Sequence, residues 1–148
     1  MKEFIKKISY SEDQPCVVLE NGLQALIDTG AKIPVWTKTE ELLLAYYPDA
    51  ERVLDTVEIG LLEGMAKGSI WKIDLIFEKL IYPRIPIFVC NSSEVEYTFL
   101  FSNSMFRKLE IRLDQFEDTF HVIIPDGESE IRNLSFRING KKIVLVQA

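Results

Sequence analysis

Apolar residues recur at every second position through much of this chain, in short runs separated by turn-forming residues. That spacing is typical of β-strands with one buried face. The clearest signal lies at residues 17–27, where two apolar runs flank Asn21-Gly22, because an Asn-Gly pair between such runs favours the tight turn of a β-hairpin. We therefore predict a hairpin whose second strand ends near Ile27.

The middle of the chain predicts a short helix and a second, longer hairpin. Residues 39–47 carry two acids directly after Thr39 and continue as an apolar stretch that Pro48 ends, which favours either a helix whose first turn is stabilised by negative charge or a loop packed on the core. Residues 53–77 indicate two strands joined by a segment with glycine at positions 60, 64 and 68. Because glycine-rich connections between strands are typically flexible, we predict a mobile hairpin tip here.

The remaining apolar runs predict further strands, so the chain is expected to be all-β. Residues 81–89 indicate a strand that two prolines would confine to a sheet edge or break in two, since proline cannot donate to a β-ladder. Residues 97–101 predict a strand, and the Ser-Asn-Ser sequence at 102–104 predicts the start of a short helix. Other strands are expected near residues 4–8 and throughout the C-terminal part, where turns are predicted at 125–127 and 139–140.

One predicted strand end carries unusual chemistry. The run Ala25-Leu26-Ile27-Asp28-Thr29-Gly30-Ala31 leads apolar residues directly into an acid, a hydroxyl and a glycine. Aspartate is depleted in strands, and a buried carboxylate must be hydrogen-bonded, paired or protonated. Asp28 therefore marks either an ordinary Asx-turn after a strand or a functional carboxylate on a loop whose backbone can approach a ligand.

Composition narrows the class of protein. A chain of 148 residues that is 47% hydrophobic and 27% charged is expected to form a single globular domain over residues 1–148. The net charge of -6 and the scattered lysines and arginines argue against nucleic-acid binding. Two cysteines and one histidine show no metal-ligand spacing, so we expect neither a metal nor a cofactor. Without a secretory signal or a run of about 18 apolar residues, we expect no membrane association and a cytoplasmic location.

The stretch VVLENGLQALIDTGAKIPVW, residues 17–36, resembles the first half of a retropepsin-like aspartic protease. That family carries its catalytic aspartate in a hydrophobic-hydrophobic-Asp-Thr/Ser-Gly-Ala motif just after such a hairpin. The order of elements extends the resemblance to about residue 113, with the glycine-rich segment in the place of the family's flap. The resemblance implies a closed β-barrel with one or two short helices that is active as a symmetric homodimer, with one or two added C-terminal strands in residues 114–148.

The same resemblance implies an aspartic endopeptidase that acts on a peptide or protein substrate. With one Asp-Thr-Gly per chain, the catalytic dyad would pair Asp28 with Asp28 of a second copy. Thr29 would cross-bond the two catalytic loops, Gly30 would bind the substrate main chain and Ala31 would line the cleft. The flap over the substrate would consist of Gly64, Met65, Ala66, Lys67 and Gly68, and the second motif of Leu100, Phe101 and Ser102.

Three positions depart from the family pattern. Ser102 stands where the family has the glycine that lets this strand lie close to the aspartate turn. Lys32 and Asn103 stand where retroviral members have an acid and an arginine that form an ion pair. Two alternatives therefore remain beside the protease: a catalytically weak or inactive dimer of the same fold that binds peptides, and an unrelated β-barrel in which Asp28 caps a turn.

Overall fold

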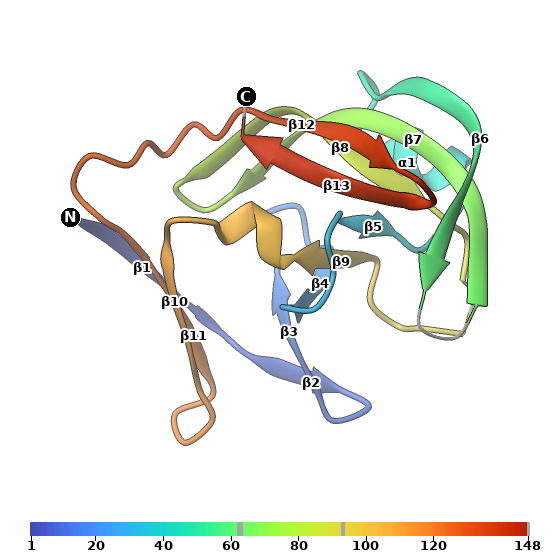
Figure 1. The fold of residues 1–148 in the computed structure, drawn as a ribbon. Coiled ribbons are helices and arrows are strands. Elements are labelled where there is room, and N and C mark those ends of the chain that lie inside the picture. The colour runs from blue at the N-terminus through green and yellow to red at the C-terminus, as the bar shows by residue number, and fades with distance from the viewer. Residues whose placement is uncertain (62–63, 93, 148) are drawn as a thin grey trace.

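The computed structural model describes residues 1–61, 64–92 and 94–147, and β-strands dominate it (Figure 1). The strands are β1 (Lys2–Lys7), β2 (Ser9–Ser11), β3 (Gln14–Val18), β4 (Gln24–Asp28), β5 (Val35–Trp36), β6 (Glu51–Leu61), β7 (Gly64–Phe77), β8 (Leu80–Val89), β9 (Phe99–Ser102), β10 (Glu110–Asp114), β11 (Thr119–Ile124), β12 (Leu134–Asn139) and β13 (Lys142–Gln147). The helical elements of these residues are α1 (Glu40–Tyr46) and the 3-10 helix η1 (Asn103–Phe106). Neither has the length and apolar character needed to cross a membrane.

The strands of the described residues form three sheets. The largest has the strand order β2-β3-β4-β9-β5-β8-β7-β6, the second has the order β1-β11-β10, and the third is the β12-β13 hairpin. Strands β4 and β9 run parallel, as do β5 and β8, while the other ladders are antiparallel. Figure 1 shows the β12-β13 hairpin above β5 and β9, with the three-stranded sheet at the end of the molecule that holds the N-terminus.

The hairpin predicted around Asn21-Gly22 is confirmed. Strands β3 and β4 pair antiparallel, with Val18 opposite Gln24. Gly22 adopts a φ of 87°, which glycine reaches without a steric penalty, and the Asn21 side chain accepts a hydrogen bond from the Leu23 N–H at 3.2 Å. Local turn chemistry thus sets the register of the strand that ends at Asp28.

The short helix predicted before Pro48 is also confirmed. Thr39 is the N-cap residue of α1, and its hydroxyl accepts the N–H of Leu42 at 3.2 Å. The two acids of the first turn lie where the helix dipole favours negative charge. Leu43 is fully buried and faces the core.

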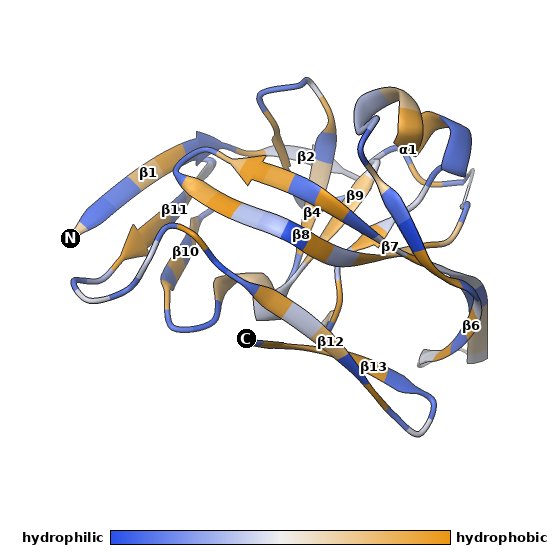
Figure 2. Cartoon of the chain, turned by 90° about the horizontal axis from the view of Figure 1, so that it is seen from above, coloured by the Kyte–Doolittle hydropathy of each residue, from blue (hydrophilic) through white to orange (hydrophobic). Residues whose placement is uncertain are grey.

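Aromatic side chains join the large sheet to the three-stranded sheet. Phe77 of β7 lies with its ring centroid 5.3 Å from that of Phe4 in β1 and 6.4 Å from that of Phe120 in β11. Its centroid is also 5.3 Å from that of Phe101 in β9. Apolar and polar residues alternate along several strands (Figure 2), as the burial of every second residue in β11 illustrates. The predicted strand periodicity therefore corresponds to a real inner face.

The predicted closed barrel is wrong for the residues that the structure describes. A sheet closes only when its two edge strands pair with each other. Here β2 and β6 remain the two edges of the eight-stranded sheet, and β1 and β10 remain the edges of the second sheet. The fold is thus mostly β but open.

The predicted strand at residues 81–89 is present, but the prediction that its prolines confine it to a sheet edge or break it in two is wrong. Strand β8 is continuous from Leu80 to Val89 and lies inside the sheet, between β5 and β7. Its prolines are tolerated because β5 pairs only with Phe88 and Val89, so that Pro83 and Pro86 lie outside that ladder. On the other side of β8, a register shift between Ile73 and Leu75 of β7 interrupts the β7-β8 ladder near Pro83.

The C-terminal part is more extensive than predicted. Three strands, β11 to β13, follow residue 114 where one or two were expected. The turn at Asn139-Gly140 is confirmed, since Gly140 has a φ of 64° and Asn139 pairs with Lys142. The helix predicted after Ser102 is the short 3-10 helix η1.

Candidate functional site

Strand β4 carries Asp28 from the core to the surface. Ala25, Leu26 and Ile27 are at most 6% exposed, because β4 is paired on both sides, by β3 and β9. Asp28 itself is half-buried, and the next two residues of the loop are exposed. The buried strand therefore holds one carboxylate in a fixed position at the start of an accessible loop.

Hydrogen bonds within the loop orient the Asp28 carboxylate. Its Oδ1 accepts the N–H of Gly30 at 2.9 Å, and its main-chain oxygen accepts the N–H of Ala31 at 3.2 Å. A Cβ atom on Gly30 would lie 3.3 Å from Asp28 Oδ1, which is a tight contact. The Asx-turn predicted for this stretch is thus present, and glycine lets the backbone N–H reach the carboxylate without crowding it.

Ser102 of the second motif lies directly beside Asp28. Strands β4 and β9 pair in parallel, with Asp28 opposite Ser102 and Ile27 opposite Phe101. Ser102 is fully buried, and its hydroxyl lies 2.7 Å from the hydroxyl of Ser104. The structure therefore has room for the hydroxymethyl group that Ser102 adds at the place of the family's glycine, and a hydrogen bond to the start of η1 holds this group.

Two further hydrogen bonds join the aspartate loop to η1. The N–H of Asn103 donates to the main-chain oxygen of Ala31 at 3.1 Å. The hydroxyl of Ser104 donates to the main-chain oxygen of Lys32 at 2.8 Å. In retroviral members of the family, an ion pair between an acid and an arginine would join these two segments. Here main-chain and hydroxyl groups hold them together, so the loop is supported without that ion pair.

Burial disfavours the ionised form of three other side chains. Burial raises the pKa of Tyr97, and the negative charges of Asp28 and Glu12 raise it further, so this phenol stays neutral near the carboxylate. Burial also raises the pKa of the thiols of Cys16 and Cys90. Since the thiolate is the nucleophilic form of cysteine, neither thiol is activated. In the described part of the chain no cluster of three or more His, Cys, Asp or Glu side chains could hold a metal ion.

The predicted flap residues form the first part of β7. In the β6-β7 ladder, Gly60 pairs with Met65 and Val57 with Gly68, while the connecting residues 62 and 63 lie outside the described residues. Met65 is 46% exposed. A Cβ atom on Gly68 would lie only 2.2 Å from the main-chain oxygen of Val89. Close packing against β8, rather than mobility, therefore requires glycine at position 68.

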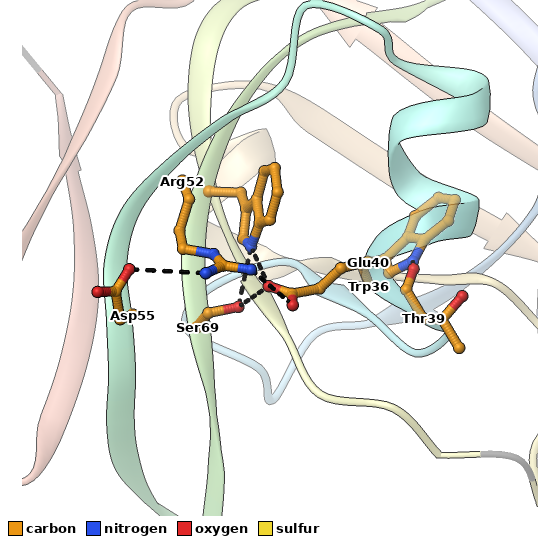
Figure 3. A network of polar contacts seen from close by, with 7 residues as sticks. Trp36, Thr39, Glu40, Arg52, Asp55 and Ser69 are labelled. Atoms are coloured by element: carbon orange, nitrogen blue, oxygen red, sulfur yellow. Dashed lines mark hydrogen bonds and ion pairs between the residues drawn. The ribbon is translucent and has the colours of Figure 1, made fainter.

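A polar network ties the base of the β6-β7 hairpin to α1 (Figure 3). Glu40 accepts hydrogen bonds from Arg52 of β6 at 2.8 Å, and from Ser69 and Trp71 of β7 at 3.0 and 2.9 Å. The Arg52 guanidinium also lies 5.2 Å from the centre of the Trp71 ring and 3.8 Å from Asp55. One carboxylate thus satisfies donors from both strands of the hairpin.

An open pocket of about 430 Å³ adjoins this network. Its lining includes Lys38 and Glu40 near the start of α1, Lys67 and Gly68 of the predicted flap, and Cys90 after β8. Asp28 is not among its lining residues. Within one chain, therefore, the structure brings the aspartate loop and the second motif together, whereas this pocket is lined by flap residues and not by Asp28.

Sequence patterns missed two parts of this region. Glu40 was interpreted only as a helix-start acid, although a nearby buried Trp71 needed an acceptor for its indole N–H. Tyr97 was interpreted only as part of a strand, and no local signal placed it near Asp28. Both contacts join segments that are distant in the sequence.

Comparisons with known proteins bear on the fold. No protein-family model matches the sequence, and no curated protein matches it. A crystal structure of a retropepsin-like aspartic protease from Rickettsia conorii matches with a TM-score of 0.51 over 82% of this chain and 89% of that chain, at 16% sequence identity. This chain has a retropepsin-like fold.

The Asp-Thr-Gly turn has a defined place in this fold. The turn follows a hairpin, lies at the end of an inner strand and is flanked by a parallel strand that enters a short helix. The fold therefore argues against the third alternative from the sequence, an unrelated β-barrel, although the turn that this alternative gives to Asp28 is present. The fold alone does not set the activity, which depends on the site.

Proposed function

We propose that this protein is an aspartic endopeptidase that acts as a symmetric homodimer. The observation that carries the proposal is the setting of Asp28, a half-buried carboxylate at the end of β4, opposite Ser102 of the parallel strand β9. The structural neighbour, described as a retropepsin-like aspartic protease, supports the same class of reaction.

The proposed chemistry needs two carboxylates that share one proton. At a separation of about 3 Å two carboxylates cannot both ionise, so one acts as a base and the other as an acid. The ionised group takes a proton from a water molecule as that water attacks the scissile carbonyl carbon, and the protonated group donates a hydrogen bond to the carbonyl oxygen. This chain has one Asp-Thr-Gly, so the second carboxylate would be Asp28 of the partner subunit, related by a twofold axis.

The other loop residues would then serve the dyad. The Gly30 N–H, 2.9 Å from Asp28 Oδ1, would hold the carboxylate in its orientation through the reaction. Exposed Thr29 would bond across the axis, Gly30 would take the main chain of an extended peptide, and Ala31 would line the cleft. The flap would be formed by the β6-β7 hairpin, including residues 64–68, whose base the Glu40 network holds against α1.

A second candidate is a dimer of the same fold that binds peptides without cutting them. Lys32 and Asn103 favour it, because the charged pair of retroviral members is absent at these positions. The hydrogen bonds from Asn103 to Ala31 and from Ser104 to Lys32 favour an intact loop in either case. Measurement of turnover separates the two candidates.

The first test is digestion of denatured casein between pH 4 and pH 7. We expect the wild type to cut with a bell-shaped pH profile, whose two apparent pKa values belong to the dyad as a pair. Asp28→Asn should lower the rate by at least about 1,000-fold, since a residue that acts in the chemical step contributes to the transition state. Asp49→Asn, an exposed aspartate in the loop after α1, should leave the rate unchanged.

A mixing experiment tests the symmetry of the site. When a ninefold excess of Asp28→Asn subunits is equilibrated with wild-type subunits, only about one wild-type subunit in ten still finds a wild-type partner, so the rate should fall about tenfold. The same excess of Asp49→Asn should not lower it. If the wild type leaves casein uncut at every pH, the result would support the binding module. If mixing with Asp28→Asn subunits does not change the rate, the result would rule out the shared dyad.

A further inference from the structure

The turn of the β12-β13 hairpin contacts the strand that leads into the proposed flap. Figures 1 and 2 both show the closed end of this hairpin directed toward β6. Lys141 lies in the turn between β12 and β13, and its main-chain oxygen accepts the N–H of Gly60 in β6 at 3.0 Å. Gly60 in turn pairs with Met65 of the predicted flap. The C-terminal hairpin is thus bonded to one strand of the proposed flap.

This hydrogen bond uses the free edge of β6. In the described residues β6 is the last strand of the eight-stranded sheet and has β7 as its neighbour. In an antiparallel pair, every second residue of an edge strand directs its N–H away from the partner strand. Gly60 is such a residue, since its acceptor lies outside the β6-β7 ladder, and Glu58 faces the same way. Among the described residues the N–H of Glu58 has no acceptor, so the hairpin engages this edge at Gly60.

The hairpin itself is anchored in the core at its base. Leu134, Ile143 and Leu145 are at most 7% exposed and belong to the main hydrophobic cluster. Ile138, which pairs with Ile143 next to the turn, is 55% exposed, so burial ends close to the tip. The tip that bonds Gly60 therefore projects from a fixed base rather than from a loose tail.

A buried charge fixes the segment that leads into β12. Arg132 is 3% exposed, and its guanidinium donates from Nε to the main-chain oxygen of Met105 at 3.1 Å and from a second nitrogen to that of Arg107. Both oxygens belong to the end of η1. The N–H of Arg132 also donates to the main-chain oxygen of Ile81 in β8 at 2.8 Å. Because a buried guanidinium is costly unless its N–H groups are bonded, these contacts hold the segment at one position.

Residues 132–147 thus contact two structures that the proposed reaction needs. Their first residue bonds the end of η1, and the start of η1 supports the Asp28 loop through Asn103 and Ser104. The turn at the far end of the same segment bonds Gly60 of β6. One continuous stretch of chain therefore links the support of the aspartate loop to the proposed flap.

We propose that the β12-β13 hairpin positions the proposed flap, with the main-chain oxygen of Lys141 holding β6 at Gly60 and Arg132 anchoring the hairpin to η1. This inference rests on the proposed function, since the place of the flap relative to Asp28 matters only if a substrate lies between them. A strand that is already held in place loses less conformational freedom when a peptide binds. Release of Gly60 should therefore raise KM, while the chemical step at Asp28 changes little.

Amide hydrogen exchange of the full chain tests the contact without reference to activity. After correction for intrinsic rates, the N–H of Gly60 should exchange at least about tenfold more slowly than that of Glu58 on the same edge. Lys141→Ala keeps the main-chain oxygen and should leave this protection unchanged. Equal exchange at Gly60 and Glu58 in the wild type would overturn the proposal, and this comparison needs no variant.

Gly140→Val disturbs the turn that carries the acceptor. Gly140 has a φ of 64° and nothing within 4 Å of an added Cβ, so valine there strains the backbone without a steric clash. Gly127→Val is the matched control, because Gly127 is also exposed, has a φ of 91° and has equally open surroundings. Its turn lies beside the N-terminus, which pairs with Asp126, and not beside β6. The two variants thus introduce similar strain at different places.

Gly140→Val should speed the exchange of the Gly60 N–H at least about tenfold. It should also raise the KM for denatured casein about fivefold, with kcat within about twofold of the wild type. Gly127→Val should change neither quantity. If Gly140→Val removes the protection and leaves KM unchanged, the positioning role is overturned.

The outcomes separate this inference from the proposed function. If the wild type cuts casein while Gly60 exchanges as fast as Glu58, the inference is overturned and the protease stands. If Gly140→Val selectively removes the protection of Gly60 in a protein that leaves casein uncut, the result would support the positioning of β6 by the hairpin and reject the protease.

Discussion

Replacement of Gly68 by alanine gives the sharpest test of the flap region. The alanine Cβ would lie 2.2 Å from the main-chain oxygen of Val89 and 2.8 Å from two ring atoms of Phe88. Carbon and oxygen atoms in contact lie about 3.3–3.6 Å apart, so the overlap with the oxygen is about 1 Å. Val89 and Phe88 are 4% and 3% exposed, and neither can move without disturbing the ladder between β7 and β8.

The two explanations of this glycine predict effects of opposite sign. If Gly68 serves flexibility, alanine should stabilise the protein by about 0.4–1 kcal/mol, because it restricts the unfolded chain. If Gly68 serves close packing, alanine should destabilise it by about 1–3 kcal/mol, the usual cost of overpacking. The structure favours the second effect.

Urea unfolding at one fixed protein concentration measures the difference, since association would otherwise shift the apparent stability. With a slope of about 2 kcal/mol per molar urea, a loss of about 2 kcal/mol lowers the unfolding midpoint by about 1 M. Gly60→Ala is the matched control, because its Cβ would lie 3.8 Å from Met65 and 3.9 Å from the Lys141 main chain, at ordinary contact distances. A midpoint for Gly68→Ala at or above that of the wild type would refute the packing argument.

Three further predictions follow from single contacts. Gly30→Ala places a Cβ 3.3 Å from Asp28 Oδ1, so casein cleavage should fall at least about tenfold while the melting temperature stays within about 3 °C of the wild type. Glu40→Ala removes the carboxylate that accepts hydrogen bonds from both flap strands and leaves the buried Trp71 indole with the Ser69 hydroxyl as its acceptor, so urea unfolding should show a loss of about 1–2 kcal/mol. Burial raises the pKa of Tyr82 above its usual value. Above about pH 10 the phenol therefore ionises first in the unfolded chain, and the wild type should lose stability as the pH rises. Tyr82→Phe should flatten that loss in unfolding curves measured between pH 9 and pH 11.

Features that depend on a few neighbouring residues were predictable from the sequence. The Asn21-Gly22 turn and the stop of the helix before Pro48 each act over a few residues, and each appears in the structure where it was predicted. The Asp28 turn belongs to the same group, because an aspartate and a glycine two residues apart suffice for an Asx-turn. These elements needed no knowledge of distant contacts.

Features that depend on pairing between distant segments were not predictable in the same way. Whether the sheet closed depended on whether its edge strands met, and the alternation of apolar residues is the same in an open sheet as in a barrel. Strand β8 keeps its prolines inside a sheet only because β5 is too short to reach them. The need for glycine at position 68 arises from a neighbour in β8 and not from its own turn.

By itself, the sequence determined the alternation that makes strands, the turns that join them and the single acid at the end of an apolar run. Only the tertiary structure decided that this acid lies beside Ser102, that η1 supports its loop and that β10 is left with an open edge. The physical reason is range: turn and strand preferences come from local sterics and hydrogen bonds, whereas sheet order depends on which buried faces fit together after the whole chain has collapsed.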